Sequence, residues 1–323
     1  MVRLARVAAA AAIGVCVSMT SALAHYPERP IRLIVTFPPG GSTDFVARVL
    51  QPYLEKALGQ PIVIDNRGGA GGVLGVDTAV KSAADGYTIV LGGAGAIAIN
   101  TALGEKMPYD PLRDLIPITN VATSPFILSA SPSLPEKTLA EVIARARRDP
   151  ATLLIGHGGN GTAMHLTALL FSQMIGAKVG LVPYRGSGPV ISDLIGGHIP
   201  LGIADAASAL AMIRAGQVKP LAVSTLQRSP LFADVPTFAE SGLPGFESTG
   251  WFGVEAPAGT PHDVIVKLNA AFVAALKDPT VVERFRSVGA EPDPMTPDEF
   301  GAFIRREIEK WSTLMATVGA KGN

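Results

Sequence analysis

Apolar residues recur along this chain with two alternating periods. The run Ile31–Val35 is continuously apolar and rich in β-branched residues, which is typical of a buried strand. In the next segment, residues 45–55, the apolar residues recur at helical spacing. Short apolar runs followed by amphipathic segments return several times further along. The pattern therefore predicts an α/β fold, with a parallel sheet covered by helices on both faces.

The later elements continue this alternation. We expect further short strands at residues 61–65, 87–91, 153–155 and 198–203. We expect helices after them at residues 73–82, 139–148 and 163–175, a helix ending at 195, and a helical tail at 263–276, 280–288 and 297–318.

Two longer apolar runs, residues 118–130 and 219–225, are predicted to cross between two domains. Two crossings imply that the first domain is discontinuous and that the middle of the chain forms the second domain. We therefore predict residues 25–122 and 225–323 as the first domain and residues 123–224 as the second. About 300 residues are sufficient for two domains of ordinary size.

The first 24 residues have the pattern of a secretory signal peptide. Arg3 and Arg6 precede an apolar run, and the small-residue site Ala22-Leu-Ala24 predicts cleavage before His25. The apolar run is short for a membrane span. Cys16, the only cysteine, lies within this segment, so the mature chain is predicted to have no disulfide, thiol nucleophile or thiolate metal site.

Composition indicates a globular protein with large cores, since 48% of residues are apolar and 17% are charged. Removing the signal peptide takes two of 27 basic residues and none of 27 acidic ones, which leaves 25 − 27 = −2. A charge so near zero gives no reason to expect nucleic acid or an acidic membrane surface as a partner. No motif in the sequence indicates a cofactor-binding or metal-binding site.

Glycine-rich turns follow several of the predicted strands, and one of them is a Gly/Ala loop expected at residues 92–96. After the first strand, Pro38 and Pro39 end the pairing, Gly40 and Gly41 let the backbone approach a ligand, and one of the residues 42–44 can cap the next helix. The free N–H groups of such a helix start can hold an anion. A second turn of this kind, residues 159–162, precedes the helix at 163. Each turn alone is equally typical of an ordinary strand-to-helix connection.

Two other classes of site fit the sequence poorly. The glycine cluster at residues 68–72 lacks the Lys-Ser/Thr ending of a phosphate-binding loop. A secreted hydrolase is disfavoured because the sequence has neither a Gly-x-Ser-x-Gly elbow nor a His-Glu-x-x-His zinc motif.

Seven segments, in this order, resemble the Bug (TctC) family, the extracytoplasmic solute receptors of tripartite tricarboxylate transporters. The resemblance covers about residues 26–319. The segments are Pro38-Pro-Gly-Gly-Ser-Thr-Asp44, Asn66-Arg-Gly-Gly-Ala-Gly-Gly72, Gly159-Asn-Gly-Thr162 with His165-Leu166, Pro183-Tyr-Arg-Gly186, Gly216-Gln-Val-Lys-Pro-Leu-Ala-Val223, Val235-Pro-Thr-Phe-Ala-Glu-Ser-Gly-Leu-Pro-Gly245 and Ala256-Pro-Ala-Gly-Thr-Pro261.

The resemblance implies a type II periplasmic-binding-protein fold, in which two α/β domains joined by crossing strands close on a small carboxylated solute. It also implies periplasmic location, delivery of the solute to a membrane permease, and no catalysis. We expect a monomer. The implied ligand-binding residues are Pro39, Gly40, Gly41, Ser42, Thr43, Asp44, Gly93, Ala94, Gly95, His157, Gly159, Asn160, Gly161, Thr162, His165 and Asp205.

The chain departs from the family pattern in the pocket region. His157 stands where Ser is common, Leu169 where Glu is common, and Ala204 and Ala206 flank Asp205 where an aromatic residue and Ser are usual. These changes keep the two turns and leave the identity of the carboxylate open. A sensor or scavenging receptor without its own permease would have the same sequence features.

Individual side chains have two interpretations each. His157 either donates to the ligand or binds it as imidazolium at acid pH, or it is a structural or exposed loop residue. His165 is expected to support its turn. Asp205 either accepts from a hydroxyl or amine of the ligand or braces the hinge. Arg185 either pairs with a second carboxylate or is a surface residue. The aromatic residues Trp251 and Phe252 are expected in the core or in packing between the domains.

Overall fold

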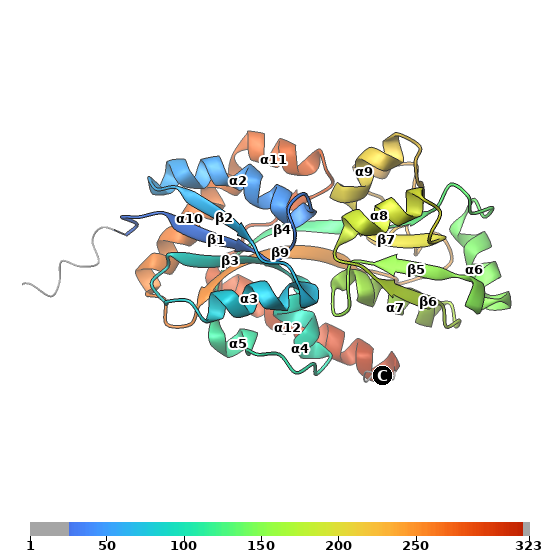
Figure 1. The fold of residues 1–323 in the computed structure, drawn as a ribbon, viewed down its shortest axis with the longest axis horizontal. Coiled ribbons are helices and arrows are strands. Elements are labelled where there is room, and N and C mark those ends of the chain that lie inside the picture. The colour runs from blue at the N-terminus through green and yellow to red at the C-terminus, as the bar shows by residue number, and fades with distance from the viewer. Residues whose placement is uncertain (1–25, 319–323) are drawn as a thin grey trace, which may run out of the picture.

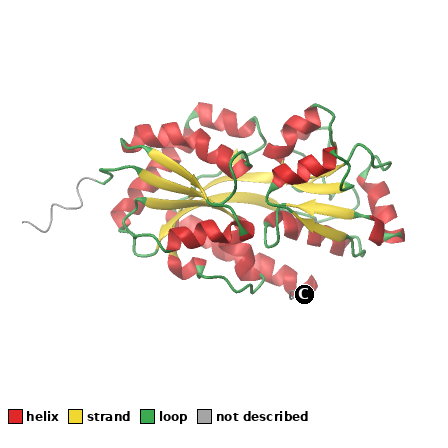
Figure 2. Cartoon of the chain, viewed as in Figure 1, coloured by secondary structure: helices red, strands yellow, loops and turns green. Residues whose placement is uncertain are grey.

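We describe a computed structural model of the chain over residues 26–318. The predicted signal peptide, residues 1–24, lies outside the described residues. Strands and helices alternate through most of the chain, and the helices cover both faces of one sheet (Figures 1 and 2). Each strand is hydrogen-bonded to its neighbours in the order β2 (Ile62–Asn66), β1 (Ile31–Val35), β3 (Thr88–Gly93), β9 (Thr249–Pro257), β4 (Leu115–Ala130), β7 (Leu201–Asp205), β5 (Leu154–His157) and β6 (Gly180–Pro183).

Three parallel strands form one side of the sheet of the first domain. β1 (Ile31–Val35) lies between β2 (Ile62–Asn66) and β3 (Thr88–Gly93). Because successive side chains of a strand point to opposite faces, β1 needs helices on both of its faces. Its Leu33 packs with the helices on one face, and its Ile34 packs with the helix on the other.

The helices on the two faces come from distant parts of the chain. On one face lie α2 (Ser42–Leu58), α10 (His262–Lys277) and α11 (Pro279–Arg286). On the other lies α3 (Val73–Val80), which contributes Val76 and Ala79 to a smaller core. The predicted return of the chain's tail to the first domain is therefore confirmed for α10 and α11 (Figure 1).

One long strand belongs to both domains. β4 (Leu115–Ala130) pairs through its first part with β9 (Thr249–Pro257), and through residues 126–130 with β7 (Leu201–Asp205) and β8 (Lys219–Val223). The strand predicted at 118–130 is therefore confirmed and begins three residues earlier. The sheet consequently continues from one domain into the other (Figure 2).

The second domain repeats the layered arrangement. β5 (Leu154–His157) lies between β6 (Gly180–Pro183) and β7, parallel to both. Its four longer helices are α6 (Leu139–Arg148), α7 (Ala163–Met174), α8 (Ser187–Ile195) and α9 (Ala206–Arg214). The boundaries 25–122, 123–224 and 225–323 stay a prediction.

The second crossing strand lies elsewhere than predicted. β8 ends at Val223 and pairs only with the last part of β4, whereas β9 accompanies β4 through residues 115–125. β9 was not predicted as a strand because two glycines interrupt its apolar run. At Gly253 a Cβ would lie 2.2 Å from the Phe300 ring. The glycine is needed so that this aromatic ring can pack directly on the strand.

The segment after β3 was predicted as a loop at residues 92–96, which is wrong. β3 continues to Gly93, and the chain then enters a helical turn, the π-helix η2 (Gly95–Ile99), followed by α4 (Asn100–Ala102). Alanine and isoleucine dominate this turn, and all five residues of η2 are buried. The small residues allow close packing here instead of a flexible connection.

The C-terminal helix α12 (Pro297–Val318) lies along β4 and η2. Glu307 on this helix accepts hydrogen bonds from the indole N–H groups of Trp251 (3.2 Å) and Trp311 (3.1 Å). The remaining short elements are η1 (Ala70–Gly72), α5 (Pro111–Asp114), η3 (Pro150–Thr152), η4 (Pro230–Phe232) and β10 (Glu291–Pro292).

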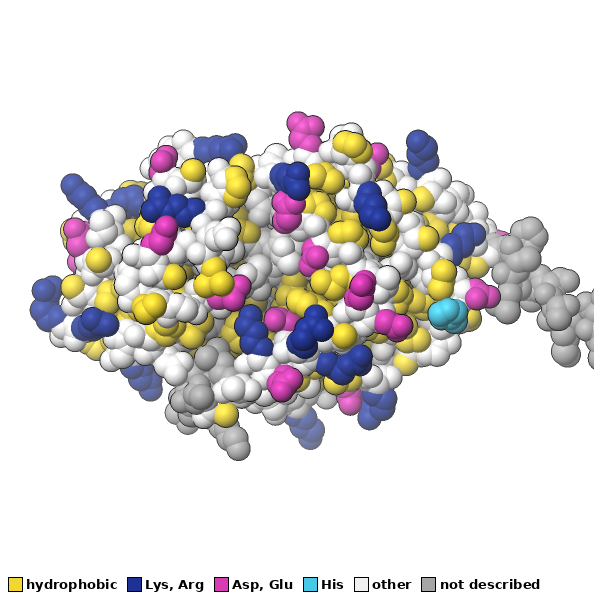
Figure 3. Space-filling view, turned by 180° about the vertical axis from the view of Figure 1, so that it is seen from behind, with side chains coloured by type: hydrophobic (Ala, Val, Ile, Leu, Met, Phe, Trp, Pro, Cys, Tyr) yellow, Lys and Arg dark blue, Asp and Glu magenta, His cyan; other side chains and the backbone are white. Residues whose placement is uncertain are grey.

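The surface carries both signs of charge. In Figure 3, lysine and arginine side chains alternate with acidic ones over the face opposite to that of Figure 1. Mixed charge of this kind favours solubility over adhesion to one highly charged partner. Within residues 26–318, none of the helices combines the length and the apolar character that a membrane crossing requires.

One acidic residue lies in the core of the first domain. Glu255 on β9 is fully buried, and neither of its carboxylate oxygens has a hydrogen-bond partner among the described residues. Burial raises the pKa of Glu255 from 4.5 to about 8. The folded protein therefore holds a proton there at pH 7 that the unfolded chain has released.

This proton makes stability depend on pH. The folded pKa lies above the unfolded one, so the contribution of Glu255 is most favourable below pH 4.5 and is lost as the pH rises toward about 8. We predict that Glu255→Gln raises the free energy of unfolding at pH 8 and removes a slope of up to about 1.4 kcal/mol per pH unit. Urea denaturation between pH 5 and 8 measures both effects. Glu247→Gln, at an exposed position, is the control, and equal slopes in both variants would contradict the assignment.

Candidate functional site

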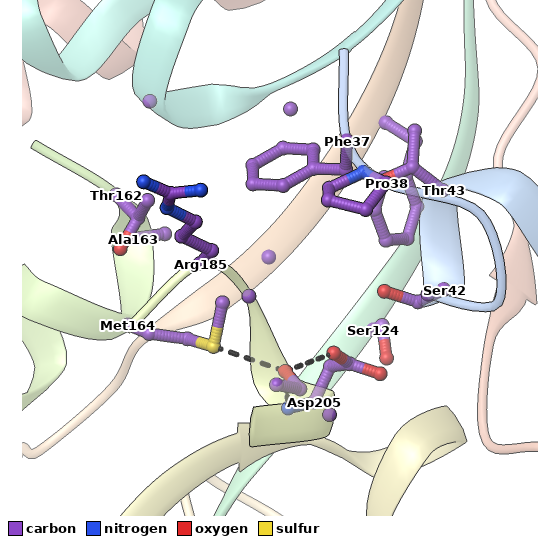
Figure 4. A pocket seen from close by; sticks show the side chains of 18 of the residues that line it. Phe37, Pro38, Ser42, Thr43, Ser124, Thr162, Ala163, Met164, Arg185 and Asp205 are labelled. Carbon is purple, nitrogen blue, oxygen red and sulfur yellow. Dashed lines mark hydrogen bonds between the residues drawn. The ribbon is translucent and has the colours of Figure 1, made fainter. Parts of the chain in front are cut away.

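A cavity of about 340 Å³ lies between the two domains (Figure 4). Its walls come from the loop after β1, the end of β3, the middle of β4, the starts of α7 and α8, the end of β7 and the start of β9. The lining residues are Phe37, Pro38, Pro39, Gly40, Gly41, Ser42, Thr43, Gly93, Ala94, Gly95, Ser124, Phe126, Thr162, Ala163, Met164, Arg185, Gly186, Ser187, Gly188, Pro189, Asp205, Gly250, Trp251 and Phe252.

The first wall is the α2 turn, residues 38–44. Gly41 is the N-cap of α2 and provides no side-chain cap, and the first bond of the helix is donated by Phe45 N–H to the Gly41 carbonyl (2.9 Å). Within the described residues, the N–H groups of Ser42, Thr43 and Asp44 have no hydrogen-bond partner. The positive end of α2 is therefore available to a ligand.

Asp44 holds this turn in place from behind. One of its carboxylate oxygens accepts from the Gly40 N–H (2.9 Å) and from Arg48 Nε (2.8 Å), and the other accepts from Asn66 Nδ2 (3.1 Å). Burial alone would raise the pKa of Asp44, but the hydrogen bonds from Arg48, Gly40 and Asn66 outweigh it and lower the pKa. Asp44 does not line the cavity, and its charged form supports the turn that does.

The second wall is the α7 turn, residues 159–162. Thr162 caps α7: its Oγ1 donates to the Gly159 carbonyl (2.7 Å) and accepts from the His165 N–H (3.3 Å). The first α-helical bond runs from Leu166 N–H to the Thr162 carbonyl (3.1 Å). Among the described residues, the N–H groups of Ala163 and Met164 are unpartnered. A second helix N-terminus thus faces the same cavity.

A third helix also begins at the cavity. Gly186 is the N-cap of α8 without a side-chain cap, and residues 186–189 line the wall. The sequence did not assign this stretch to the site. The signal that would have assigned it to the site is its position after a strand of the same parallel sheet.

The α7 turn also touches the first domain directly. A Cβ added to Gly161 would lie 1.9 Å from Asn100 Oδ1, and one added to Gly95 would lie 2.8 Å from the Gly161 carbonyl oxygen. On the other side of the turn, a Cβ at Gly71 would lie 2.8 Å from the Asn160 carbonyl oxygen. Side chains are therefore excluded from this contact, which holds the two domains against each other beside the cavity.

Two stacked histidines lie beneath the α7 turn. The rings of His157 and His165 are 4.6 Å apart, and His165 Nδ1 accepts from the Gly161 N–H (3.3 Å). His157 Nδ1 lies 3.2 Å from the carbonyl oxygen of Gly159 and 3.3 Å from its N–H, so either tautomer finds a partner.

Both histidines are uncharged at neutral pH, and they support the α7 turn. Burial, followed by the charge of His165, lowers the pKa of His157 from 6.5 to about 4, and burial lowers the pKa of His165. His157 is fully buried and does not line the cavity. The structure therefore places it below the turn, where it contacts the backbone of Gly159.

Asp205 lines the cavity, but its carboxylate already accepts hydrogen bonds from other residues of the protein. As the N-cap of α9 it accepts from the Ser208 N–H (2.9 Å), and it also accepts from the hydroxyls of Ser187 (2.5 Å) and Ser208 (3.3 Å). The Ser187 hydroxyl also lies 3.3 Å from Met164 Sδ (Figure 4). These bonds join the starts of α7, α8 and α9 into one wall.

Ten of the residues implied by the sequence line the cavity together, namely Pro39, Gly40, Gly41, Ser42, Thr43, Gly93, Ala94, Gly95, Thr162 and Asp205. The other six lie behind it or at its edge, namely Asp44, His157, Gly159, Asn160, Gly161 and His165.

The sequence also missed part of the lining. Trp251 and Phe252, expected in the core, are largely buried and also line the cavity, because β9 passes its floor. Ser124 and Phe126 on β4 line it as well. These residues carry no motif, and only the position of the crossing strands identifies them.

Gly161 provides a direct test of the contact between the domains. We predict that Gly161→Ala lowers affinity for the solute, because its Cβ displaces the α7 turn from Asn100. Gly176→Ala is the matched control: its φ of +65° is close to the +72° of Gly161, but no atom lies near its Cβ. Backbone strain should cost each variant about 1 kcal/mol of stability, and the contact with Asn100 adds to this loss in Gly161→Ala. Equal solute affinity in both variants, measured by calorimetry, would show that the contact is unimportant for binding.

Residues 46–320 match the model of the family described as TctC, tripartite tricarboxylate transporter family receptor. Protein BugT of Bordetella pertussis is 43% identical over 297 residues, which cover 92% of this chain and 91% of BugT.

Solved structures agree with this assignment. Rpa4515 of R. palustris, solved with adipate, has a TM-score of 0.88 at 37% identity and covers 91% of this chain and 98% of its own. MatC of Rhodopseudomonas palustris, solved with bound malate, has a TM-score of 0.85 at 34% identity, covering 89% and 99%. The type II periplasmic-binding-protein fold predicted from the sequence is thereby confirmed. With its two domains, its intervening cavity and these relatives, the chain belongs to the Bug (TctC) family of tripartite tricarboxylate transporter receptors.

Proposed function

We propose that this protein captures a small carboxylated solute in the cavity between its domains and delivers it to the permease of a tripartite transporter. The observation that carries this proposal is the pair of helix N-termini that face one cavity from opposite domains. The free N–H groups of Ser42, Thr43 and Asp44 belong to one domain, and those of Ala163 and Met164 to the other.

Backbone N–H groups at helix starts suit a carboxylate for two reasons. They are obligatory donors that need acceptors, and the helix dipole adds partial positive charge at the same place. A carboxylate has two oxygens and can accept from both turns at once. A neutral amide of the same shape would lose the charge and turn one acceptor into a donor.

The relatives support the same class of ligand. Rpa4515 was solved with adipate and MatC with malate, and both ligands are small carboxylates. We propose that the implied turn residues of this chain hold such a ligand, with Pro39, Gly40, Gly41, Ser42 and Thr43 on one side and Thr162 on the other. The buried residues Asp44, His157 and His165 then act by positioning these turns.

Binding at two opposed walls provides a signal to a membrane partner. A solute that contacts both domains favours the closed arrangement by its difference in affinity for the closed and open states. We propose that the permease recognises the closed form, that the protein releases the solute unchanged, and that it acts as a periplasmic monomer after loss of residues 1–24.

We predict that carboxylates raise the melting temperature of the mature chain, from residue 25, whereas their amides do not. A ligand at 100 times its dissociation constant stabilises the folded state by about 2.7 kcal/mol, which corresponds to a few degrees for a chain of this size. A thermal-shift screen of acids and their amides measures this. Mass spectrometry of the denatured protein detects a solute retained from the expression host. A chain free of retained solute that responds only to neutral compounds would contradict the proposal.

A further inference from the structure

The glycine-rich loop at residues 66–72 does not reach the cavity. The sequence singled it out, yet none of these seven residues, all of which the structure describes, is part of the cavity lining. The loop leads from the end of β2 to α3, and α3 begins at the end of the first domain that faces the second (Figure 1). The role of the loop therefore has to follow from its contacts with the walls of the cavity.

The first part of the loop is fixed to the α2 turn. Asn66 Nδ2 donates to the Phe37 carbonyl (3.0 Å) and to the Asp44 carboxylate (3.1 Å), so one amide holds the chain on both sides of that turn. Two residues further on, a Cβ added to Gly68 would lie 2.9 Å from Pro38 Cδ. The loop consequently packs directly on the α2 turn, with no side chain between them.

The last part of the loop touches the second domain. A Cβ added to Gly71 would lie 2.8 Å from the Asn160 carbonyl oxygen, which belongs to the α7 turn. A Cβ added to Gly95 would lie 2.8 Å from the Gly161 carbonyl oxygen and 3.3 Å from that of Gly71, so the two glycines of the first domain lie side by side against the turn. The α7 turn thus rests on bare backbone of the first domain.

The path of the loop between these two contacts is fixed. Its last four residues all have positive φ, from +48° at Ala70 to +140° at Gly69, and large side chains strongly disfavour such values. The Gly72 N–H donates to the Gly69 carbonyl (3.0 Å). A Cβ on Gly72 would lie 3.3 Å from both Thr36 Oγ1 and Ala96 Cβ, so the loop is also closely packed on the first domain. Its thickness between the two turns is therefore set by the backbone.

We propose that residues 66–72 form a spacer that sets the distance between the α2 and α7 turns in the closed protein, with Gly71 as its positioning residue. This inference rests on the proposed function, in which both turns hold the same carboxylate. N–H donors from two turns can share one carboxylate only at a suitable separation, because hydrogen bonds weaken steeply with distance and angle. Since the loop lies outside the cavity lining, a thicker loop weakens the binding of different acids by a similar factor.

Gly71→Ala and Gly59→Ala form a matched pair that separates spacing from backbone strain. The two glycines have φ of +63° and +70° and both belong to the first domain, but nothing lies near a Cβ at Gly59, which follows the far end of α2. Calorimetry on the mature protein would use adipate and malate as probes. We expect Gly71→Ala to bind them about tenfold or more weakly than Gly59→Ala, with similar factors for the two acids.

The distance between the domains provides a second readout that needs no solute. The mature chain has no cysteine, so Val266→Cys on α10 and Ser192→Cys on α8 give one exposed site for a spin label in each domain. Pulsed electron double resonance then measures the distribution of distances between the labels. We expect the Gly71→Ala protein to have a larger share of long distances than the Gly59→Ala protein, because the added Cβ holds the α7 turn away from the first domain.

A double variant tests whether Gly71 and Gly161 act on the same turn. Both added side chains displace the α7 turn, so the loss of affinity in Gly71→Ala/Gly161→Ala should be smaller than the product of the two single losses. Losses that multiply in full would mean that the two glycines act independently, which contradicts a shared role in spacing.

The outcomes distinguish the spacer from the proposed function. Equal affinities and equal distance distributions in Gly71→Ala and Gly59→Ala would overturn the inference and leave the proposed function intact. If neither these acids nor any other acid binds the wild-type protein, the proposed function fails, and the solute-free distances decide the role of the loop. Identical distributions in the two variants would then overturn the inference as well.

Discussion

The continuous pairing of β4 with strands of both domains is the constraint on which the site depends. β4 pairs with β9 in the first domain and with β7 and β8 in the second, so the two sheets meet along one strand. The carboxyl ends of β1, β3, β5 and β7 consequently lead into loops around one cavity. Ligands of parallel sheets bind beyond these strand ends. Here the two sets of strand ends face each other.

The site has few recognisable residues because backbone groups are proposed to bind the solute, while the side chains shape the turns. The donors proposed to meet the solute are amide N–H groups, which every residue type except proline carries. The polar side chains nearby mostly serve to shape the turns: Asp44 braces the α2 turn, Thr162 caps α7, and Asp205 caps α9. His157 and His165 support the α7 turn from below as neutral groups. The chemistry of such a site depends on the geometry of its turns more than on the residue types that form them.

The sequence was informative where local rules dominate. Strand–turn–helix units are set by short-range patterns, so the positions of β1, α6 and α7 were predicted nearly to the residue, while α2 extends three residues beyond its predicted bounds at each end. The return strand β9 was missed because its glycines serve contacts with Phe126 and Phe300, which lie far away in the sequence. The roles of Asp205 and His157 were left open because their partners come from other elements. Long-range packing determined each of these outcomes.

The central claim is that free backbone N–H groups of two opposed helices receive one carboxylate, and amide resonances report this directly. Two-dimensional ¹H–¹⁵N spectra of the deuterated protein would be recorded during addition of the acid that raises its melting temperature. Our account predicts that the amide signals of Thr43 and Ala163 move downfield most, while that of Phe45, already bonded to the Gly41 carbonyl, moves little. Saturable shifts elsewhere, with Thr43 and Ala163 unchanged, would contradict it.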